Sequence, residues 1–206
     1  MFIKVCGMRQ TENIEAVASL GVDALGFIFY PKSPRHCLPM LDPESIEKLP
    51  VNTKKVGVFV NSSLEVVRIV AKVFGLTGIQ LHGHETASMA ESLADSGLEV
   101  WKAFGINNDF DFDETLPFQQ VCSAFVFDTK SDSHGGSGQK YNWDKLKEYQ
   151  GKTPFLLSGG IKPGDELAIK QFTHPACMGL DLNSGFEMEP GLKDAEAIRI
   201  FMEQLH

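Results

Sequence analysis

The 206-residue sequence lacks the features that place a protein in a membrane, outside the cell or around a structural metal. No apolar run approaches the ~18 residues typical of a membrane-spanning helix. The first residues, MFIKVCGMRQ, lack the charged and then apolar layout of a secretion signal. The four cysteines, at positions 6, 37, 122 and 177, form no C-x-x-C pair, so neither a zinc site nor a disulfide framework is indicated. We therefore expect a reduced, cytoplasmic protein with no membrane association and no bound metal.

A surplus of positive charge is also absent. The formal net charge is −8, whereas proteins that bind nucleic acids or membrane surfaces need a basic face. This charge excludes a general nucleic-acid binder, but a small anionic substrate can still be held by a local site in an acidic protein. We expect a small-molecule substrate and no nucleic-acid partner, and no obligate protein partner is implied.

The sequence does contain a repeating alternation of short apolar runs and helical patterns. Segments with helical spacing of apolar residues are clearest at 11–21, 62–75, 85–97 and 194–205. Alternating strands and helices predict parallel βαβ units, and nearly continuous apolar strands predict a sheet covered on both faces. The runs predicted as strands are 2–6, 24–29, 55–60, 78–82, 99–104, 124–128, 154–158 and 177–182.

Two architectures fit this alternation: an open doubly wound sheet and a closed (β/α)8 barrel. The count of eight strands favours the barrel, although the chain is short for that fold. The Ser/Gly-rich segment 130–143 is predicted to be a loop and no linker, because a division there would leave a C-terminal part with only two strands. We therefore predict an α/β protein with a single-domain (β/α)8 TIM barrel over residues 1–206.

Small residues and glycine follow two successive predicted strands, in LLSGG (156–160) and LDLNSGFE (180–187). The loops after the seventh and eighth strands of such barrels frequently bind phosphate through backbone N–H groups. Glycine lets the backbone approach phosphate oxygens without an obstructing Cβ. Short Gly/Ser clusters are usually ordinary turns, but two of them at these strand ends favour a phosphate site.

Cys6 and Asp128 are the reactive candidates. Cys6 ends the first predicted strand beside Gly7, where the open mouth of the barrel is expected. A thiolate there can act as a base if a positive neighbour lowers its pKa from ~8.5. Asp128 ends the sixth strand, where a lone carboxylate is more often a helix cap or an ion-pair partner; its functional interpretation depends on pairing with Cys6 as acid and base. The other three cysteines fit the role of small core hydrophobes.

Other side chains extend this predicted site. Lys4 and Cys6 alternate along one strand and should face the same side. Asp181 lies near the end of the eighth strand, which neighbours the first in a closed barrel, so we expect a buried Lys4–Asp181 pair. Arg35, in YPKSPRH, is either a solvated loop charge or a clamp on a substrate carboxylate. His82 ends the fourth strand and is either a hydrogen-bonded histidine, the simpler interpretation, or a substrate contact.

The sequence resembles the phosphoribosylanthranilate isomerase family in motifs that occur in order over nearly the whole chain. These are KVCGMR, GFIFYPKSPR, GVFVN, QLHG, FDT, GGSG, LSGGI and DLNSGFE…PGLKD. Each motif alone is weak, whereas the ordered set is specific. The resemblance implies a (β/α)8 barrel that converts N-(5-phosphoribosyl)anthranilate to 1-(2-carboxyphenylamino)-1-deoxyribulose 5-phosphate, an Amadori rearrangement in tryptophan biosynthesis that uses no cofactor.

The resemblance also implies residue roles: Cys6 is the general base, Asp128 the general acid, and Arg35 holds the anthranilate carboxylate. The family commonly has serine where this chain has Asn183, which leaves backbone contacts intact and removes any hydroxyl contact. The phosphate is placed on Ser158, Gly159, Gly160, Asn183, Ser184 and Gly185, and Arg35, His82 and Asp181 complete the predicted substrate-binding set.

These roles make two demands on the residues. Protonated Asp128 must open the furanose ring to a Schiff base and the Cys6 thiolate must then remove the C2 proton, so one pKa should be raised and the other lowered. The glycines in loop 130–142 predict a lid that orders over bound substrate.

Two other kinds of phosphate-binding barrel fit the sequence less well. A base cysteine disfavours other barrels of the pathway, indole-glycerol-phosphate synthase and the tryptophan synthase α subunit. The combination of Cys6 and Asp128 disfavours a non-catalytic phosphosugar-binding barrel.

Overall fold

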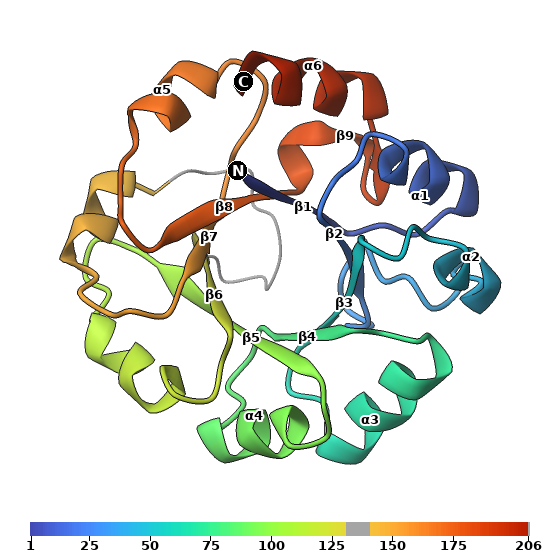
Figure 1. Ribbon diagram of the computed structural model, residues 1–206, viewed down its shortest axis with the longest axis horizontal. Helices are drawn as coiled ribbons and strands as arrows, with labels where there is room; N and C mark the ends of the chain where they lie inside the picture. Colours follow the sequence, from blue (N-terminus) through green and yellow to red (C-terminus); the bar gives the residue numbers. More distant parts are fainter. Residues whose placement is uncertain (131–140, 206) are drawn as a thin grey trace.

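The computed structural model describes residues 1–130 and 141–205, which contain a closed barrel of parallel strands with helices outside it (Figure 1). Neighbours along the chain pair in order, and β8 returns to pair with β1. The predicted barrel is confirmed, and the doubly wound sheet is excluded. Most of loop 130–142, where we predicted a lid, lies outside the described residues. The barrel strands are β1 (Phe2–Cys6), β2 (Ala24–Ile28), β3 (Lys54–Phe59), β4 (Gly78–Leu81), β5 (Glu99–Ile106), β6 (Ala124–Thr129), β7 (Phe155–Leu157) and β8 (Cys177–Leu182).

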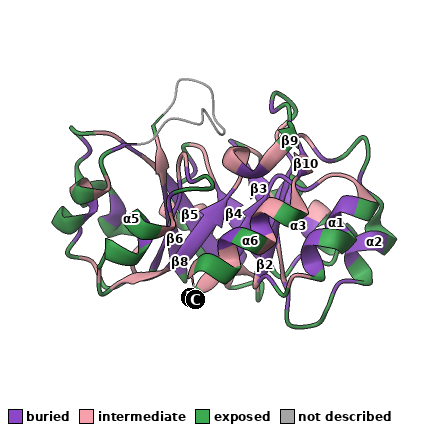
Figure 2. Ribbon diagram, turned by 90° about the horizontal axis from the view of Figure 1, so that it is seen from above, coloured by how far each residue is buried: buried purple, intermediate pink, exposed green. Residues whose placement is uncertain are grey.

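Side chains alternate between the interior of the barrel and the layer beneath the helices, as the two-residue period of a strand requires. Ile3 and Val5 of β1 belong to the outer core, and Cys6 belongs to an inner cluster near the carboxyl ends of the strands. Trp101 is fully buried in a second inner cluster. Figure 2 shows the strands as the buried centre of the molecule and the helices as partly exposed.

The four helices predicted most clearly from the sequence are present. Ser63 caps the second of them, because its Oγ accepts a hydrogen bond of 3.3 Å from Val66 N. Thr11 is the first residue of the first helix, and Gln10 occupies the cap position without a side-chain hydrogen bond. These helices are α1 (Thr11–Ala18), α3 (Leu64–Val73), α4 (Ala87–Ala94) and α6 (Ala195–Leu205).

The remaining outer segments are short. Pro117 lies inside η1 and has no N–H to donate, which accounts for a 3-10 helix where a regular barrel has an α-helix. None of the described helices has the length and apolarity needed to cross a membrane. The short helices are α2 (Pro43–Glu47) and α5 (Glu166–Gln171), with the 3-10 helices η1 (Phe112–Phe118) and η2 (Trp143–Glu148).

The chain after β8 has a feature that the sequence did not predict. A 3-10 turn, η3 (Ser184–Phe186), leads into an antiparallel hairpin of β9 (Glu187–Glu189) and β10 (Leu192–Lys193). Figure 2 shows this hairpin at the edge of the molecule opposite the C-terminal end of α6. The loop after β8 therefore continues into a 3-10 turn and a hairpin before α6 begins.

Candidate active site

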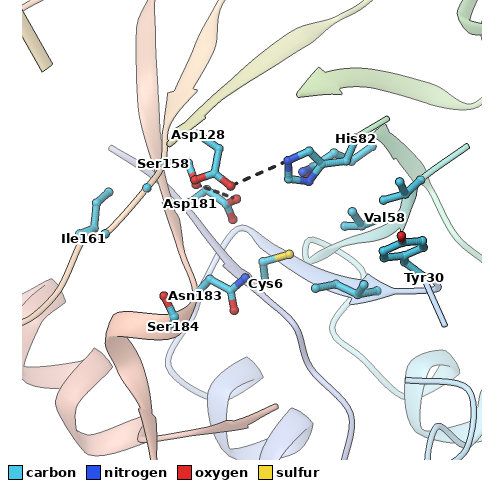
Figure 3. Close-up of a pocket in the computed structure, with 15 residues that line it drawn as sticks. Cys6, Tyr30, Val58, His82, Asp128, Ser158, Ile161, Asp181, Asn183 and Ser184 are labelled. Carbon is cyan, nitrogen blue, oxygen red and sulfur yellow. Dashed lines mark hydrogen bonds and ion pairs between the residues drawn. The ribbon is translucent and has the colours of Figure 1, made fainter. Parts of the chain in front are cut away.

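A cavity lies at the carboxyl ends of the barrel strands, where the sequence predicted the site (Figure 3). It brings together all the predicted site residues except Arg35 and Gly185, so residues that lie in or directly after β1, β4, β6, β7 and β8 share one space. The lining residues are Cys6, Ile28, Tyr30, Val58, Val60, Gln80, His82, Asp128, Ser158, Gly159, Gly160, Ile161, Asp181, Asn183 and Ser184.

The thiol of Cys6 is fixed at the end of β1 by the neighbouring strand. Cys6 pairs in register with Gly26 of β2, and a Cβ at Gly26 would lie only 2.7 Å from the Cys6 sulfur, so glycine leaves the space that the thiol occupies. Cys6 is 3% exposed. Burial raises the pKa of the Cys6 thiol, and the nearby charge of Asp181 adds to this, while Lys4 and Lys193 act in the opposite direction. Our expectation of a lowered pKa is wrong, because the loss of hydration exceeds the effect of the two ammonium groups.

Asp128 lies across the cavity from Cys6, at the end of β6. Burial raises its pKa to about 6, and the negative charge of Asp181 contributes in the same direction. Its Oδ1 accepts a hydrogen bond of 2.8 Å from Thr129 N, and its Oδ2 lies 3.8 Å from His82 Nε2. A carboxyl group with a raised pKa is suited to donating a proton near neutral pH.

Lys4 and Asp181 form the buried pair that the sequence predicted. They are register partners on β1 and β8, with 2.8 Å between Lys4 Nζ and Asp181 Oδ1. Ser158 Oγ, at the end of β7, donates to Asp181 Oδ2 over 3.4 Å. Asp181 therefore binds both Lys4 at the seam of the barrel and Ser158 after β7, and its carboxylate lines the cavity.

The loops after β7 and β8 approach each other closely because they contain glycine. Gly159 and Gly160 have φ of 91° and 67°, a region that favours glycine, and a Cβ at Gly159 would overlap Thr129. A Cβ at Gly185 would overlap the carbonyl oxygen of Ile161, so this glycine lets the two loops pack together although it does not itself line the cavity. Such paired glycine-containing loops can bind an anion through backbone N–H groups.

Arg35 is bound to a protein carboxylate in this structure. Its Nε donates to Glu187 Oε1 over 2.9 Å, and its Nη2 donates to Glu187 Oε2 over 2.7 Å. Both side chains are buried, so Arg35 is not the solvated loop charge that was one of our two interpretations. Its predicted contact with a substrate carboxylate remains a prediction.

Sequence reasoning missed the apolar wall of the cavity and one polar residue. Ile28, Val58 and Tyr30 pack with Cys6 in the inner cluster, and strand alternation with Cys6 as a reference would have indicated the first two. Gln80 of β4 also lines the cavity, and its buried Oε1 has no hydrogen-bond partner within the described part of the chain. Among residues 1–130 and 141–205, no group of three or more His, Cys, Asp or Glu side chains is arranged to hold a metal ion.

Comparison with known proteins gives a consistent result. The family model for N-(5'-phosphoribosyl)anthranilate (PRA) isomerase matches residues 3–204. N-(5'-phosphoribosyl)anthranilate isomerase of Phocaeicola vulgatus is 46% identical over 205 residues, a match that covers 100% of this chain and 98% of that protein. This chain belongs to the phosphoribosylanthranilate isomerase family. The resemblance inferred from the ordered motifs is thereby confirmed.

Solved structures of the phosphoribosylanthranilate isomerase family share the barrel. The enzyme of Thermus thermophilus matches with a TM-score of 0.83 and 30% identity, covering 100% of this chain and 98% of that chain. A phosphoribosylanthranilate isomerase in complex with reduced 1-(o-carboxyphenylamino)-1-deoxyribulose 5-phosphate matches with a TM-score of 0.81 and 29% identity, over the same shares of the two chains.

Proposed function

We propose that this chain isomerises N-(5-phosphoribosyl)anthranilate to 1-(2-carboxyphenylamino)-1-deoxyribulose 5-phosphate in tryptophan biosynthesis, with Cys6 as general base and Asp128 as general acid. The observation that carries the proposal is the placement of a thiol and a carboxyl group of raised pKa in one cavity, beside two glycine-containing loops. Family membership supports the choice of substrate.

The first step opens the sugar ring. Protonated Asp128 donates its proton to the ring oxygen, the bond between that oxygen and C1 breaks, and the lone pair of the anthranilate nitrogen forms a C1–N double bond. A pKa of about 6 keeps part of the Asp128 population protonated near neutral pH, which an unperturbed aspartate would not achieve. The positive Schiff base that results makes the proton on C2 more acidic.

The second step moves a proton from carbon. The Cys6 thiolate takes the C2 proton, and the C–H electron pair forms a C1–C2 double bond while the iminium nitrogen regains its lone pair. The enolamine then becomes the C2 ketone by losing the hydroxyl proton and gaining a proton at C1. Since burial raises the pKa of Cys6, formation of the thiolate depends on the two ammonium groups that oppose this effect, those of Lys4 and Lys193.

The phosphate and the carboxylate of the substrate are assigned to two different sets of residues. The loops that contain Ser158 to Gly160 and Asn183 to Gly185 offer backbone N–H groups to the phosphate. Arg35 is assigned the carboxylate: Glu187 takes its Nε and Nη2 donors, and in the described residues no acceptor is bound to Nη1. His82 and Asp181 also line the cavity and remain part of the proposed substrate-binding set.

A fluorescence assay that follows the loss of phosphoribosylanthranilate tests the proposal. The wild-type protein should turn the substrate over, and Cys6→Ala should lower kcat by about 10²–10⁴-fold while the circular-dichroism spectrum is unchanged. Cys177→Ala is the matched control, because this cysteine begins β8 and lies outside the cavity. An inactive wild type would refute the substrate, and a fully active Cys6→Ala variant would remove Cys6 from the mechanism.

A further inference from the structure

Lys193 is a buried lysine that the mechanism above uses only indirectly. It lies outside the barrel, on β10 of the short hairpin, and is 1% exposed. Asn13 of α1 holds its backbone on both sides: Asn13 Nδ2 donates to Lys193 O over 2.8 Å, and Lys193 N donates to Asn13 Oδ1 over 2.8 Å. These two hydrogen bonds tie β10 to α1 at Lys193.

The ammonium group of Lys193 joins two residues at the cavity. Its Nζ lies 2.5 Å from Glu187 Oε1 and donates over 2.7 Å to Asn183 Oδ1. Glu187 also binds Arg35, and Asn183 lines the cavity at the loop after β8 (Figure 3). The Lys193–Glu187 ion pair therefore contacts both Arg35, the residue predicted to bind the substrate carboxylate, and Asn183, in the loop predicted to bind the phosphate.

The same ammonium group lies close to the turn that follows Cys6. Gly7 has a φ of 84°, and a Cβ placed on it would lie 3.4 Å from Lys193 Nζ and 3.0 Å from Asn183 Oδ1. Lys193 is thus packed directly against the backbone of this turn.

Burial lowers the pKa of Lys193 to about 8, while Glu187 and Cys6 act in the opposite direction. The charged groups at or behind the thiol are Lys4 on β1, Asp181 on β8, Lys193 on β10, Glu187 on β9, Arg35 after β2, and, across the cavity, Asp128 and His82.

Stability alone is a weak reason for a buried ammonium group at this position. Burying an ammonium group removes its hydration, and an apolar pair of similar volume is often as stable as a buried ion pair or more stable. The Lys193–Glu187 pair has no exposed route to solvent, with side chains 0% and 5% exposed. The ammonium group also donates to Asn183, which lines the cavity.

We propose that Lys193, fixed in place by Glu187, is a positioning residue of this site. Its ammonium group holds the Asn183 side chain at the phosphate end of the cavity and places positive charge behind the Cys6–Gly7 turn. The inference deepens the proposed function and rests on it. The hydrogen bond from Lys193 Nζ gives the Asn183 side chain a defined partner.

The first test measures the Cys6 thiol without substrate. The rate of alkylation of Cys6 by iodoacetamide, followed by peptide mass spectrometry, should be about tenfold lower at pH 7 in Lys193→Met than in wild type, because a neighbouring positive charge favours the thiolate. The difference should shrink above about pH 8, where Lys193 itself loses its proton. A role confined to stability would not produce this pH dependence.

Lys102→Met is the matched control. Lys102 is also buried and paired with a glutamate, Glu85, at 3.4 Å, and its Nζ donates to Gly83 O over 2.7 Å. Its removal should lower stability without changing the pH dependence of Cys6 alkylation. Equal alkylation profiles for folded Lys193→Met and wild type would overturn the electrostatic part of the proposal.

The second test measures the binding of inorganic phosphate to variants of Asn183. Its outcome therefore does not depend on whether Lys193→Met folds. Asn183→Leu removes the acceptor and keeps the Lys193–Glu187 pair, and it should weaken inorganic phosphate binding about tenfold, a loss comparable with that of one hydrogen bond to a charged group. Asn183→Ser should retain more affinity than Asn183→Leu. Unchanged phosphate binding in both would overturn the positioning part. A wild type that binds no phosphate would instead count against the proposed function, so the two failures are distinguishable.

Discussion

Lys4 and Asp181 form a buried ion pair with 2.8 Å between Nζ and Oδ1, at the seam where β1 meets β8. Lys4 is on the same face of its strand as Cys6, and its charge favours the thiolate there. Asp181 lines the cavity and raises the pKa of Asp128. The electrostatics of both proposed catalytic groups therefore depend on one pair at the seam of the barrel.

Removing one partner of this pair should destabilise the protein. Lys4→Met leaves the Asp181 carboxylate buried without its cation, which should lower the free energy of unfolding by about 3–5 kcal/mol in urea denaturation. The double variant Lys4→Met/Asp181→Leu should recover much of the loss, since it leaves no uncompensated charge. A loss below about 1 kcal/mol in the single variant would show that the pair contributes little, as exposed pairs do.

Asp128→Asn should change how stability depends on pH. The folded-state pKa of about 6 is above the usual 3.8, so the proton of Asp128 stabilises the fold fully below about pH 4, and this contribution is lost as pH rises through about 6. Asparagine has no such loss. The stability of the variant relative to wild type should therefore increase by about 1–3 kcal/mol between pH 4 and pH 7, discounted for the 16% exposure of the side chain.

Urea unfolding at several pH values measures this difference. Asp109→Asn is the control, because it removes one carboxyl group that is exposed in the loop after β5 and lies outside the cavity. A flat profile for Asp128→Asn would show that the Asp128 carboxyl group has an ordinary pKa and is no general acid of the proposed kind.

The position of the site could be predicted from the sequence, because it depends only on the alternation of strands and helices and on the rule that sites form at the carboxyl ends of parallel strands. Eight alternating strands fix the barrel, and the carboxyl ends of its strands then bring together Cys6, Asp128 and the glycine loops, although they are distant in the chain. The Lys4–Asp181 pair followed from closure of the barrel and strand alternation alone. These features depend on order and period, which a sequence displays directly.

Other features depend on packing and could not be read in this way. The raised pKa of Cys6 results from how completely neighbouring side chains exclude water. The binding of Arg35 by Glu187 requires the hairpin after β8, whose two short strands have no clear pattern of their own. The loop of Arg35 and this hairpin are 152 residues apart in sequence, so neither side chain identifies the other as its partner.

Arg35→Ala should weaken the binding of ligands that carry the anthranilate carboxylate. Loss of a charge-assisted hydrogen bond predicts an affinity loss of about tenfold or more for a product analogue, measured by calorimetry. An analogue with hydrogen in place of the carboxylate should lose much less. Arg199→Ala, which removes an arginine bound only to exposed glutamates of α6, is the control for charge. Equal losses for both analogues in Arg35→Ala would assign Arg35 to the support of Glu187 and the hairpin instead.

Gly185→Ala should separate the two loops that we assign to the phosphate. An added Cβ would overlap the carbonyl oxygen of Ile161, and a backbone atom cannot rotate away, so the loop after β8 must move. Such overpacking typically costs about 1–3 kcal/mol. Part of it should appear as weaker binding of inorganic phosphate and a higher KM. Gly78→Ala is the matched control, because its Cβ would meet Val56 Cγ2 at an ordinary 3.4 Å at the start of β4. If Gly185→Ala loses stability but binds phosphate as tightly as Gly78→Ala, the close approach of these loops serves the fold alone, and the phosphate must be bound elsewhere.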